Sequence, residues 1–211
     1  MQGGSGSSSE DNTHWLMRDW TEFIDASAKY SAIGESVFQN YSSLTSVNFP
    51  ACTNIGSGAF NYCTSLTSAD FPVCTNIGYS AFYSCSGLTS VNFPICTGIN
   101  SNAFNYCSNL TSVDFPACTY IGDNAFNNCF NLSVVSFPKL HTIYNYAFYN
   151  CIKLSSMYLL GDSVPSIVST VASTFASVIK FYVKESMYSA FITANKWSTI
   201  SSRIFSVPDE Q

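Results

Sequence analysis

The stretch CTNIGYSAFYSCSGLTSVNFPI, residues 74–95, decides the fold because variants of it recur every 22 residues. The six copies begin at Tyr30, Cys52, Cys74, Cys96, Cys118 and Leu140. A single coil of this length is too short to bury a core, whereas stacked coils share a continuous one. The repeat therefore predicts a solenoid of six 22-residue coils over residues 30–161.

Three columns of large apolar residues occupy fixed positions in the coil and are expected to face inward. The phenylalanine column is Phe38, Phe60, Phe82, Phe104, Phe126 and Phe148. The isoleucine column is Ile33, Ile55, Ile77, Ile99, Ile121 and Ile143. The leucine column is Leu44, Leu66, Leu88, Leu110, Leu132 and Leu154. Leu88, Val91 and Phe93 follow the L-x-x-V-x-F spacing typical of a leucine-rich repeat strand, with Val91 and Phe93 on its buried face.

Proline ends this strand in five coils and forces the chain to turn. The prolines are Pro50, Pro72, Pro94, Pro116 and Pro138. Glycines after the isoleucine, such as Gly78, suggest a second corner, and the A-F-x-x-C stretch after it is expected to wind as a short helical or 3₁₀ turn. The predicted fold class is an α/β-type leucine-rich repeat solenoid with short parallel strands on one face and an irregular opposite face.

The phrase I-G-x-x-A-F-x-x-C-x-x-L-x-x-V-x-F-P resembles the BspA-like, or Treponema pallidum type, leucine-rich repeat of bacterial and protozoan surface proteins. The resemblance covers the six copies in residues 30–161. It implies a right-handed curved solenoid, a place at a cell surface and a role in adhesion or protein binding. It does not imply an enzyme.

Charge is distributed unevenly along the chain, whose formal net charge is -5. No lysine or arginine occurs from Tyr30 through Pro138. Because phosphate groups are bound by cations, nucleic acid and anionic lipid are poor partners for the coils. No apolar run is long enough to cross a bilayer, so direct membrane insertion is not expected. We expect an extracellular or cell-surface protein whose export signal is absent from this sequence.

The nine cysteines form two columns, each repeating with the coil. They are Cys52, Cys63, Cys74, Cys85, Cys96, Cys107, Cys118, Cys129 and Cys151. Small thiols suit the bends of a narrow coil, which favours reduced and buried side chains. Disulfides between neighbouring coils remain an alternative, although parallel Cβ vectors make their torsions hard to reach. Zinc is the weakest alternative, because C-x-x-C pairs and clustered histidines are missing.

Both flanks are predicted to cap the open ends of the solenoid. Residues 1–10 are expected to form a flexible linker or the scar of an engineered junction. Residues 11–29 are predicted to form a capping helix, in which Trp15, Leu16, Trp20, Phe23 and Ile24 recur at helical spacing. Residues 162–211 are predicted to form the C-terminal cap.

Within this C-terminal cap, the sequence predicts a strand at 179–183 and a helix at 186–196, followed by Trp197 as a core anchor. Residues 181–204 resemble the C-terminal cap found on many bacterial proteins of this family. Lys184 stands where the family has proline.

Catalytic chemistry is not expected. His141 stands where four coils carry threonine, which makes it a solvated variant of the repeat. Asp70 and Asp114 lie two coils apart in one column, and we do not interpret them as glycosidase carboxylates. The sequence indicates no enzyme, no cofactor and no metal site.

Tyrosine dominates the variable positions opposite the strand face, among Asn, Ser and Gly. These tyrosines are Tyr62, Tyr79, Tyr83, Tyr106, Tyr120, Tyr144, Tyr146 and Tyr149, and all except Tyr120 are candidate ligand-binding residues. Tyrosine adds contact area at low entropic cost in binding loops. The alternative is that these residues are soluble filler of the repeat. A second candidate site, on the strand face, comprises Asp70, Asn92 and Asp114.

The functional hypothesis is therefore a non-enzymatic binding or adhesion protein of a bacterial cell surface that recognises a host or neighbouring-cell protein or glycan. A structural spacer or a phage-tail receptor-binding element is the alternative. Threonine ranks such as Thr53, Thr75 and Thr97 make an ice-binding solenoid a remote third hypothesis. The sequence leaves the ligand and the oligomeric state open.

Overall fold

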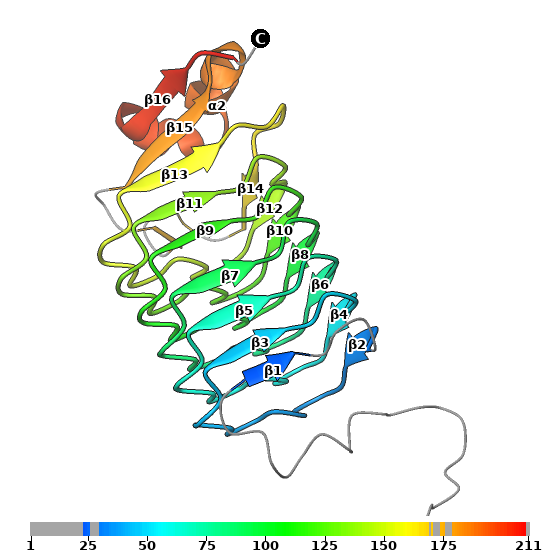
Figure 1. The fold of residues 1–211 in the computed structure, drawn as a ribbon. Coiled ribbons are helices and arrows are strands. Elements are labelled where there is room, and N and C mark those ends of the chain that lie inside the picture. The colour runs from blue at the N-terminus through cyan, green and yellow to red at the C-terminus, as the bar shows by residue number, and fades with distance from the viewer. Residues whose placement is uncertain (1–22, 26–29, 169, 171–173, 176–178, 210–211) are drawn as a thin grey trace, which may run out of the picture.

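The computed structural model of the 211-residue chain describes residues 23–25, 30–168, 170, 174–175 and 179–209. They form a solenoid in which parallel strands stack coil upon coil, and the C-terminal segment closes one end (Figure 1). Paired strands of successive coils are offset by 22 residues, as in the pairing of Ser68 with Ser90. The predicted repeat solenoid is confirmed.

The strands that follow the leucine column form the long-strand ladder. They are β1 (Phe23–Asp25), β3 (Ser46–Asn48), β5 (Ser68–Asp70), β7 (Ser90–Asn92), β9 (Ser112–Asp114), β11 (Val134–Ser136) and β13 (Ser156–Leu159), extended by β15 (Lys180–Lys184) and β16 (Ile204–Val207). All their pairings are parallel. The ladder is divided, because within the described chain no strand pairing joins β7 to β9.

A second set of strands forms the short-strand ladder, which the sequence did not predict. It comprises β2 (Ala32–Ile33), β4 (Asn54–Ile55), β6 (Asn76–Ile77), β8 (Gly98–Ile99), β10 (Tyr120–Ile121), β12 (Thr142–Ile143) and β14 (Ser166–Ile167). The expectation of strands on one face only is therefore wrong. The buried isoleucine column aligns neighbouring backbones for two residues before the chain turns, and their polar groups pair there.

The A-F-x-x-C stretch forms a series of β-turns, and the predicted helical turn is wrong. In each of the six coils, the residue before this stretch and the fourth residue within it have positive φ, for example Gly58 (63°) and Tyr62 (61°). A helix requires negative φ throughout, so these positions interrupt it. Left-handed backbone favours glycine and asparagine, which explains why Gly, Asn and Ser are frequent here.

Backbone hydrogen bonds of this turn face alternate between two kinds. The N–H groups of Gly58, Phe60 and Tyr62 donate to carbonyls of the next coil at 2.7–2.8 Å. The N–H groups of Ala59, Asn61 and Cys63 donate to the carbonyl three residues earlier in the same coil, at 3.0–3.3 Å. Each N–H group from residue 58 to residue 63 is thus paired, which allows an irregular backbone to stack as regularly as a sheet.

The predicted phenylalanine, isoleucine and leucine columns are all buried, as expected. Rings of the phenylalanine column stack face to face along the solenoid, as Phe82 and Phe104 do with centroids 5.2 Å apart. A second buried column, from the strand position of Phe93, packs edge-on against the first at centroid distances near 6 Å. Shared rings make each coil part of its neighbours' core.

All nine cysteines are buried and unpaired, in agreement with the favoured prediction. The thiol of Cys85 donates to the carbonyl of Phe60 in the preceding coil at 3.0 Å, and four other cysteines repeat this contact. The thiol of Cys74 donates to the carbonyl of Asn76 at 3.2 Å, which three others repeat. Cysteine thus fills space and also satisfies a backbone oxygen at both bends.

The predicted N-terminal helix is wrong at Phe23 and Ile24, which belong to strand β1. The backbone of β1 pairs with β3, so it supplies hydrogen-bond partners to the edge of the first coil. These backbone hydrogen bonds to β3 stabilise the strand more than the helical spacing of the apolar residues would stabilise a helix. The remainder of the predicted helix, and the predicted linker at 1–10, lie outside the described residues.

The C-terminal cap contains the predicted strand, displaced by one residue as β15. The predicted helix divides into η2 (Glu185–Met187) and α2 (Tyr188–Thr193), and η3 (Trp197–Arg203) with β16 follow. Trp197 is fully buried, as predicted, and its indole N–H donates to the carbonyl of Pro165 at 2.7 Å. Strand β14 still pairs with β12, so coil geometry continues beyond residue 161.

Candidate ligand-binding surfaces

Three of the predicted tyrosines form a continuous row across adjacent coils of the turn face. The ring of Tyr83 lies edge-on between those of Tyr62 and Tyr106, with centroids 5.5 and 5.8 Å away. Burial and the neighbouring phenols raise the pKa of Tyr83, so this central phenol stays neutral. Tyr62 and Tyr106 are 45% and 43% exposed, which leaves ring surface free for contact.

A second aromatic pair lies farther along the same face. Tyr146 and Tyr149 meet edge to face at 5.6 Å. Tyr146 belongs to the last complete coil and Tyr106 to the fourth, so Tyr146 does not extend the tyrosine row. The structure therefore divides the predicted turn-face tyrosines into a row of three and a separate pair.

Three of these tyrosines occupy left-handed backbone, which suits their side chains poorly. Tyr62, Tyr106 and Tyr146 have φ between 55° and 63°. Other coils place Gly, Ser or Asn at the same positions, which avoid or tolerate this conformation better. Exposed tyrosines held in an unfavourable conformation contribute less to the fold than asparagine would, an arrangement that often accompanies function.

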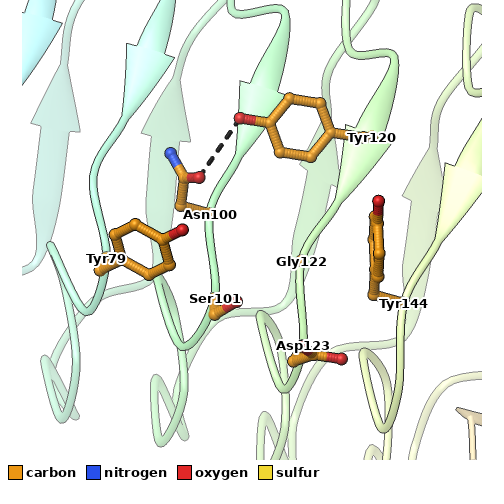
Figure 2. Close-up of a pocket in the computed structure, with 7 residues that line it drawn as sticks. All are labelled: Tyr79, Asn100, Ser101, Tyr120, Gly122, Asp123 and Tyr144. Carbon is orange, nitrogen blue, oxygen red and sulfur yellow. Dashed lines mark hydrogen bonds between the residues drawn. The ribbon is translucent and has the colours of Figure 1, made fainter.

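The remaining candidates, Tyr79 and Tyr144, lie in a different place, beside the short-strand ladder. Together with Tyr120 they border a pocket of about 410 Å³, the tyrosine pocket. Its lining comprises Tyr79, Asn100, Ser101, Tyr120, Gly122, Asp123 and Tyr144. Figure 2 shows Tyr79 and Tyr144 at opposite ends, with Tyr120 reaching across toward Asn100.

Tyr120 can lie across the pocket because the preceding coil carries glycine at the equivalent position. A Cβ atom on Gly98 would stand 2.3 Å from Cε1 of Tyr120, far closer than van der Waals contact allows. The Tyr120 hydroxyl donates to Oδ1 of Asn100 at 3.3 Å. Burial raises the pKa of Tyr120, which keeps this donor protonated.

Two polar side chains of the pocket are held in place by neighbouring coils. Nδ2 of Asn100 donates to the carbonyl of Ile77 at 2.8 Å and to Oδ1 of Asn76 at 3.1 Å. Oδ1 of Asp123 accepts from the backbone N–H and from Nδ2 of Asn145, at 2.9 and 2.7 Å. The pocket thus combines fixed amide and carboxylate groups with exposed aromatic rings.

The alternative residues on the strand face lie at the division of the long-strand ladder. Asn92 and Asp114 line a pocket of about 260 Å³ between β7 and β9, with Pro94 and Pro116. Asp70 lies outside its lining and accepts a hydrogen bond from Nδ2 of Asn92 at 2.7 Å. This site is smaller than the tyrosine pocket, and no aromatic ring lines it.

The threonine ranks have a structural role that bears on ice binding. The hydroxyl of Thr75 donates to the carbonyl of Thr53 at 3.1 Å, and that of Thr97 donates to Thr75 at the same distance. Thr67 and Thr89 make equivalent bonds in the other rank. These hydroxyl protons join coils together, so they are not directed outward toward ice.

Possible metal ligands do not gather in the described part of the chain. There, no group of three or more His, Cys, Asp or Glu side chains is placed to hold a metal ion. His141 lines a pocket with Lys139 and Asp162 beside the cap, where Lys184 pairs with Asp162 at 2.6 Å. Among these described residues, none of the helices has the length and apolar character that a bilayer span requires.

Sequence reasoning missed Tyr120, Asn100, Ser101 and Asp123 as site residues. The signal was present as departures from the repeat. Gly98 replaces the asparagine of the two preceding coils, and Asn100 replaces the glycine of Gly78. These paired exceptions to the fixed columns open one pocket and supply polar groups to it.

The fold and its exposed tyrosines define a solenoid repeat protein with a regular apolar core and aromatic side chains on its surface. A family model for the BspA type leucine-rich repeat region, with six copies, matches residues 21–117 and 97–207. The chain belongs to this family, as the repeat phrase suggested.

Solved structures of bacterial proteins share the fold. A leucine-rich cell surface protein of Faecalibacterium prausnitzii is 28% identical with a TM-score of 0.59, over 89% of this chain and 48% of that one. A leucine-rich repeat protein of Bacteroides ovatus is 27% identical with a TM-score of 0.66, over 78% and 42%. The T. pallidum leucine-rich repeat protein has a TM-score of 0.66 at 24% identity, covering 75% of this chain and 79% of that one.

The chain spans less than half the length of the first two of these structures. No curated protein matches the sequence. The similarity therefore identifies a family of bacterial surface proteins and its solenoid fold. The ligand of this chain has to be inferred from the residues of the chain itself.

Proposed function

We propose that the protein is a non-enzymatic binding protein of a bacterial cell surface that recognises a protein or a glycan through its solenoid surface. The family is generally non-enzymatic, and its structural relatives include a cell surface protein. Leucine-rich repeat proteins typically bind other proteins. The proposal extends these family properties to adhesion by this chain.

The observation that carries the proposal is the tyrosine row. Tyr62, Tyr83 and Tyr106 join three coils in one aromatic strip, of which the two outer rings are exposed and the central ring is half-buried. Two of the three are kept in left-handed backbone, where asparagine would be accommodated more easily. Tyrosine provides large contact area with few rotatable bonds, which reduces the entropic cost of binding. A purely structural spacer would gain nothing from this arrangement.

The test is a binding screen of the intact chain on arrays of immobilised extracellular-matrix proteins and glycans. We expect a retained ligand whose affinity falls at least tenfold when Tyr62, Tyr83 and Tyr106 are replaced together by serine, with the melting temperature nearly unchanged. Replacement of Asn92 and Asp114 by alanine is the matched control on the strand face. Loss of binding in that control alone would move the site to the strand face, and no binding on any array would favour the spacer.

Salt dependence provides a second readout of the same proposal. The coils from Tyr30 to Pro138 carry no lysine or arginine, so they cannot attract an anionic ligand. Affinity should therefore change little between low and high ionic strength. A steep loss of affinity with salt would contradict recognition by the uncharged tyrosine surfaces.

A further inference from the structure

We propose that the tyrosine pocket binds a short neutral saccharide, a disaccharide unit of a larger glycan. This inference rests on the proposed function and names the ligand class of one site within it. The site is the pocket bordered by Tyr79, Tyr120 and Tyr144, with Asn100, Ser101 and Asp123 between them (Figure 2).

The pocket is constructed by paired substitutions in neighbouring coils. Gly98 removes the side chain that would collide with the ring of Tyr120, and Gly122 lets its backbone approach the backbone of Asn100 and Ser101 closely. Asn100 anchors the Tyr120 hydroxyl and is itself fixed by two donated bonds. A pocket of about 410 Å³ lies within the size range of small-molecule sites.

The lining offers the two kinds of contact that a saccharide needs. Exposed rings at Tyr79 and Tyr144 can stack on the C–H faces of sugar rings. Among the residues that the structure describes, Asp123 uses only Oδ1 in hydrogen bonds, so Oδ2 can accept from sugar hydroxyls. A charged acceptor forms stronger hydrogen bonds than a neutral one, which suits a ligand rich in hydroxyl donors.

Charge excludes anionic ligands from this pocket. Asp123 is the one ionised group in the lining, and no lysine or arginine occurs in the six-coil segment before Lys139. A phosphate, a sulfate or a sialic acid carboxylate would meet a like charge and no cation. The charge of the pocket therefore permits neutral and cationic ligands only.

Size separates a saccharide from a compact cation held in an aromatic cage. A cation interacts with a ring within about 6 Å of its centroid. Tyr79 and Tyr144 lie three coils apart, which is roughly 14 Å along the solenoid at the usual strand spacing. A small ammonium group cannot contact both ends, whereas two linked sugar rings can.

The experiment measures binding of the intact chain to immobilised lactose, cellobiose, maltose and N,N′-diacetylchitobiose, with sialyllactose and sulfated lactose beside them. We expect retention of at least one neutral disaccharide and none of the charged forms. Replacing both Tyr79 and Tyr144 by serine should abolish this binding. Asp123→Asn keeps an acceptor for Asn145. It should weaken disaccharide binding about tenfold, which is the difference between a charged and a neutral hydrogen bond.

Gly98→Ala tests the geometry with all lining residues in place. The added Cβ would displace the flexible ring of Tyr120 and leave the backbone untouched, so folding should persist while saccharide affinity falls. Ile152→Ser, at an exposed apolar residue outside the tyrosine pocket and the tyrosine row, is the control and should bind the saccharide as the natural chain does.

The outcomes distinguish this inference from the function on which it rests. Failure to bind any neutral disaccharide, or equal binding by the Tyr79/Tyr144 variant, overturns the saccharide site. If a matrix protein or another glycan is still bound through the tyrosine row, the proposed surface function stands without it. If the chain binds nothing on any array, both fail together.

Discussion

Many repeated side chains in this solenoid form hydrogen bonds that connect neighbouring coils. Threonine hydroxyls and cysteine thiols donate to backbone carbonyls, mostly of the preceding coil, as Thr75 and Cys85 do. Periodicity predicted that these side chains recur and, for cysteine, that they are buried. It could not predict the acceptor, because the partner is fixed by the offset of one coil on the next.

At the residue scale, Phe104→Ala should lower the free energy of unfolding by about 3 to 5 kcal/mol. Its ring is fully buried and stacks between Phe82 and Phe126, each 5.2 Å away. Phe38→Ala should cost less, because within the described residues Phe38 stacks on one phenylalanine of its column, Phe60. Urea denaturation of both variants measures the difference, and equal losses would argue against a shared core.

A second residue-scale prediction concerns the left-handed column. Ser80 has a φ of 53°, so Ser80→Val should destabilise by about 1 to 2 kcal/mol, because a β-branched residue is disfavoured there. Ser80→Gly should be neutral within a few tenths of a kcal/mol, since glycine adopts this conformation freely. Thermal denaturation compares the two, and the reverse order would mean that the turn can change conformation.

Elements show where the repeat pattern predicts structure and where it does not. The leucine-to-phenylalanine spacing predicted the long-strand ladder, because three residues with alternating burial are enough to be recognised. The short-strand ladder escaped prediction, since two-residue strands such as Asn76–Ile77 show no alternation. Strand β1 was missed for another reason: pairing with an open edge depends on the neighbouring coil and overrides local helical spacing.

At the element scale, the division of the long-strand ladder should appear in amide hydrogen exchange. The N–H groups of Phe71 and Phe115 donate to the next coil at 3.0 Å. Phe93, at the equivalent position between β7 and β9, has no such bond among the described residues. Its amide should therefore exchange faster by an order of magnitude or more. Equal protection of all three amides would show that the ladder is continuous in solution.

The whole molecule is a stack whose sequence encodes the core more completely than the surface. Six repeats predicted the solenoid, its buried columns and a cap anchored by Trp197. The tyrosine pocket depends instead on exceptions, Gly98 with Tyr120 and Asn100 with Asp123, that lie in different coils. Their proximity requires the coil register, which the structure supplies.

At this scale, the buried thiols should make stability fall with rising pH. Burial raises the pKa of Cys63 and Cys74 to about 12 and that of Cys96 to about 11. The native state therefore keeps protons that the unfolded state loses above about pH 9. Each such thiol lowers the free energy of unfolding by up to about 1.4 kcal/mol per pH unit in that window. Urea denaturation in the presence of reductant at pH 7.5 and 9.5 measures the change in the free energy of unfolding. Cys107→Ala removes one buried thiol and should make this change smaller. A stability that does not depend on pH would mean that the thiols are exposed.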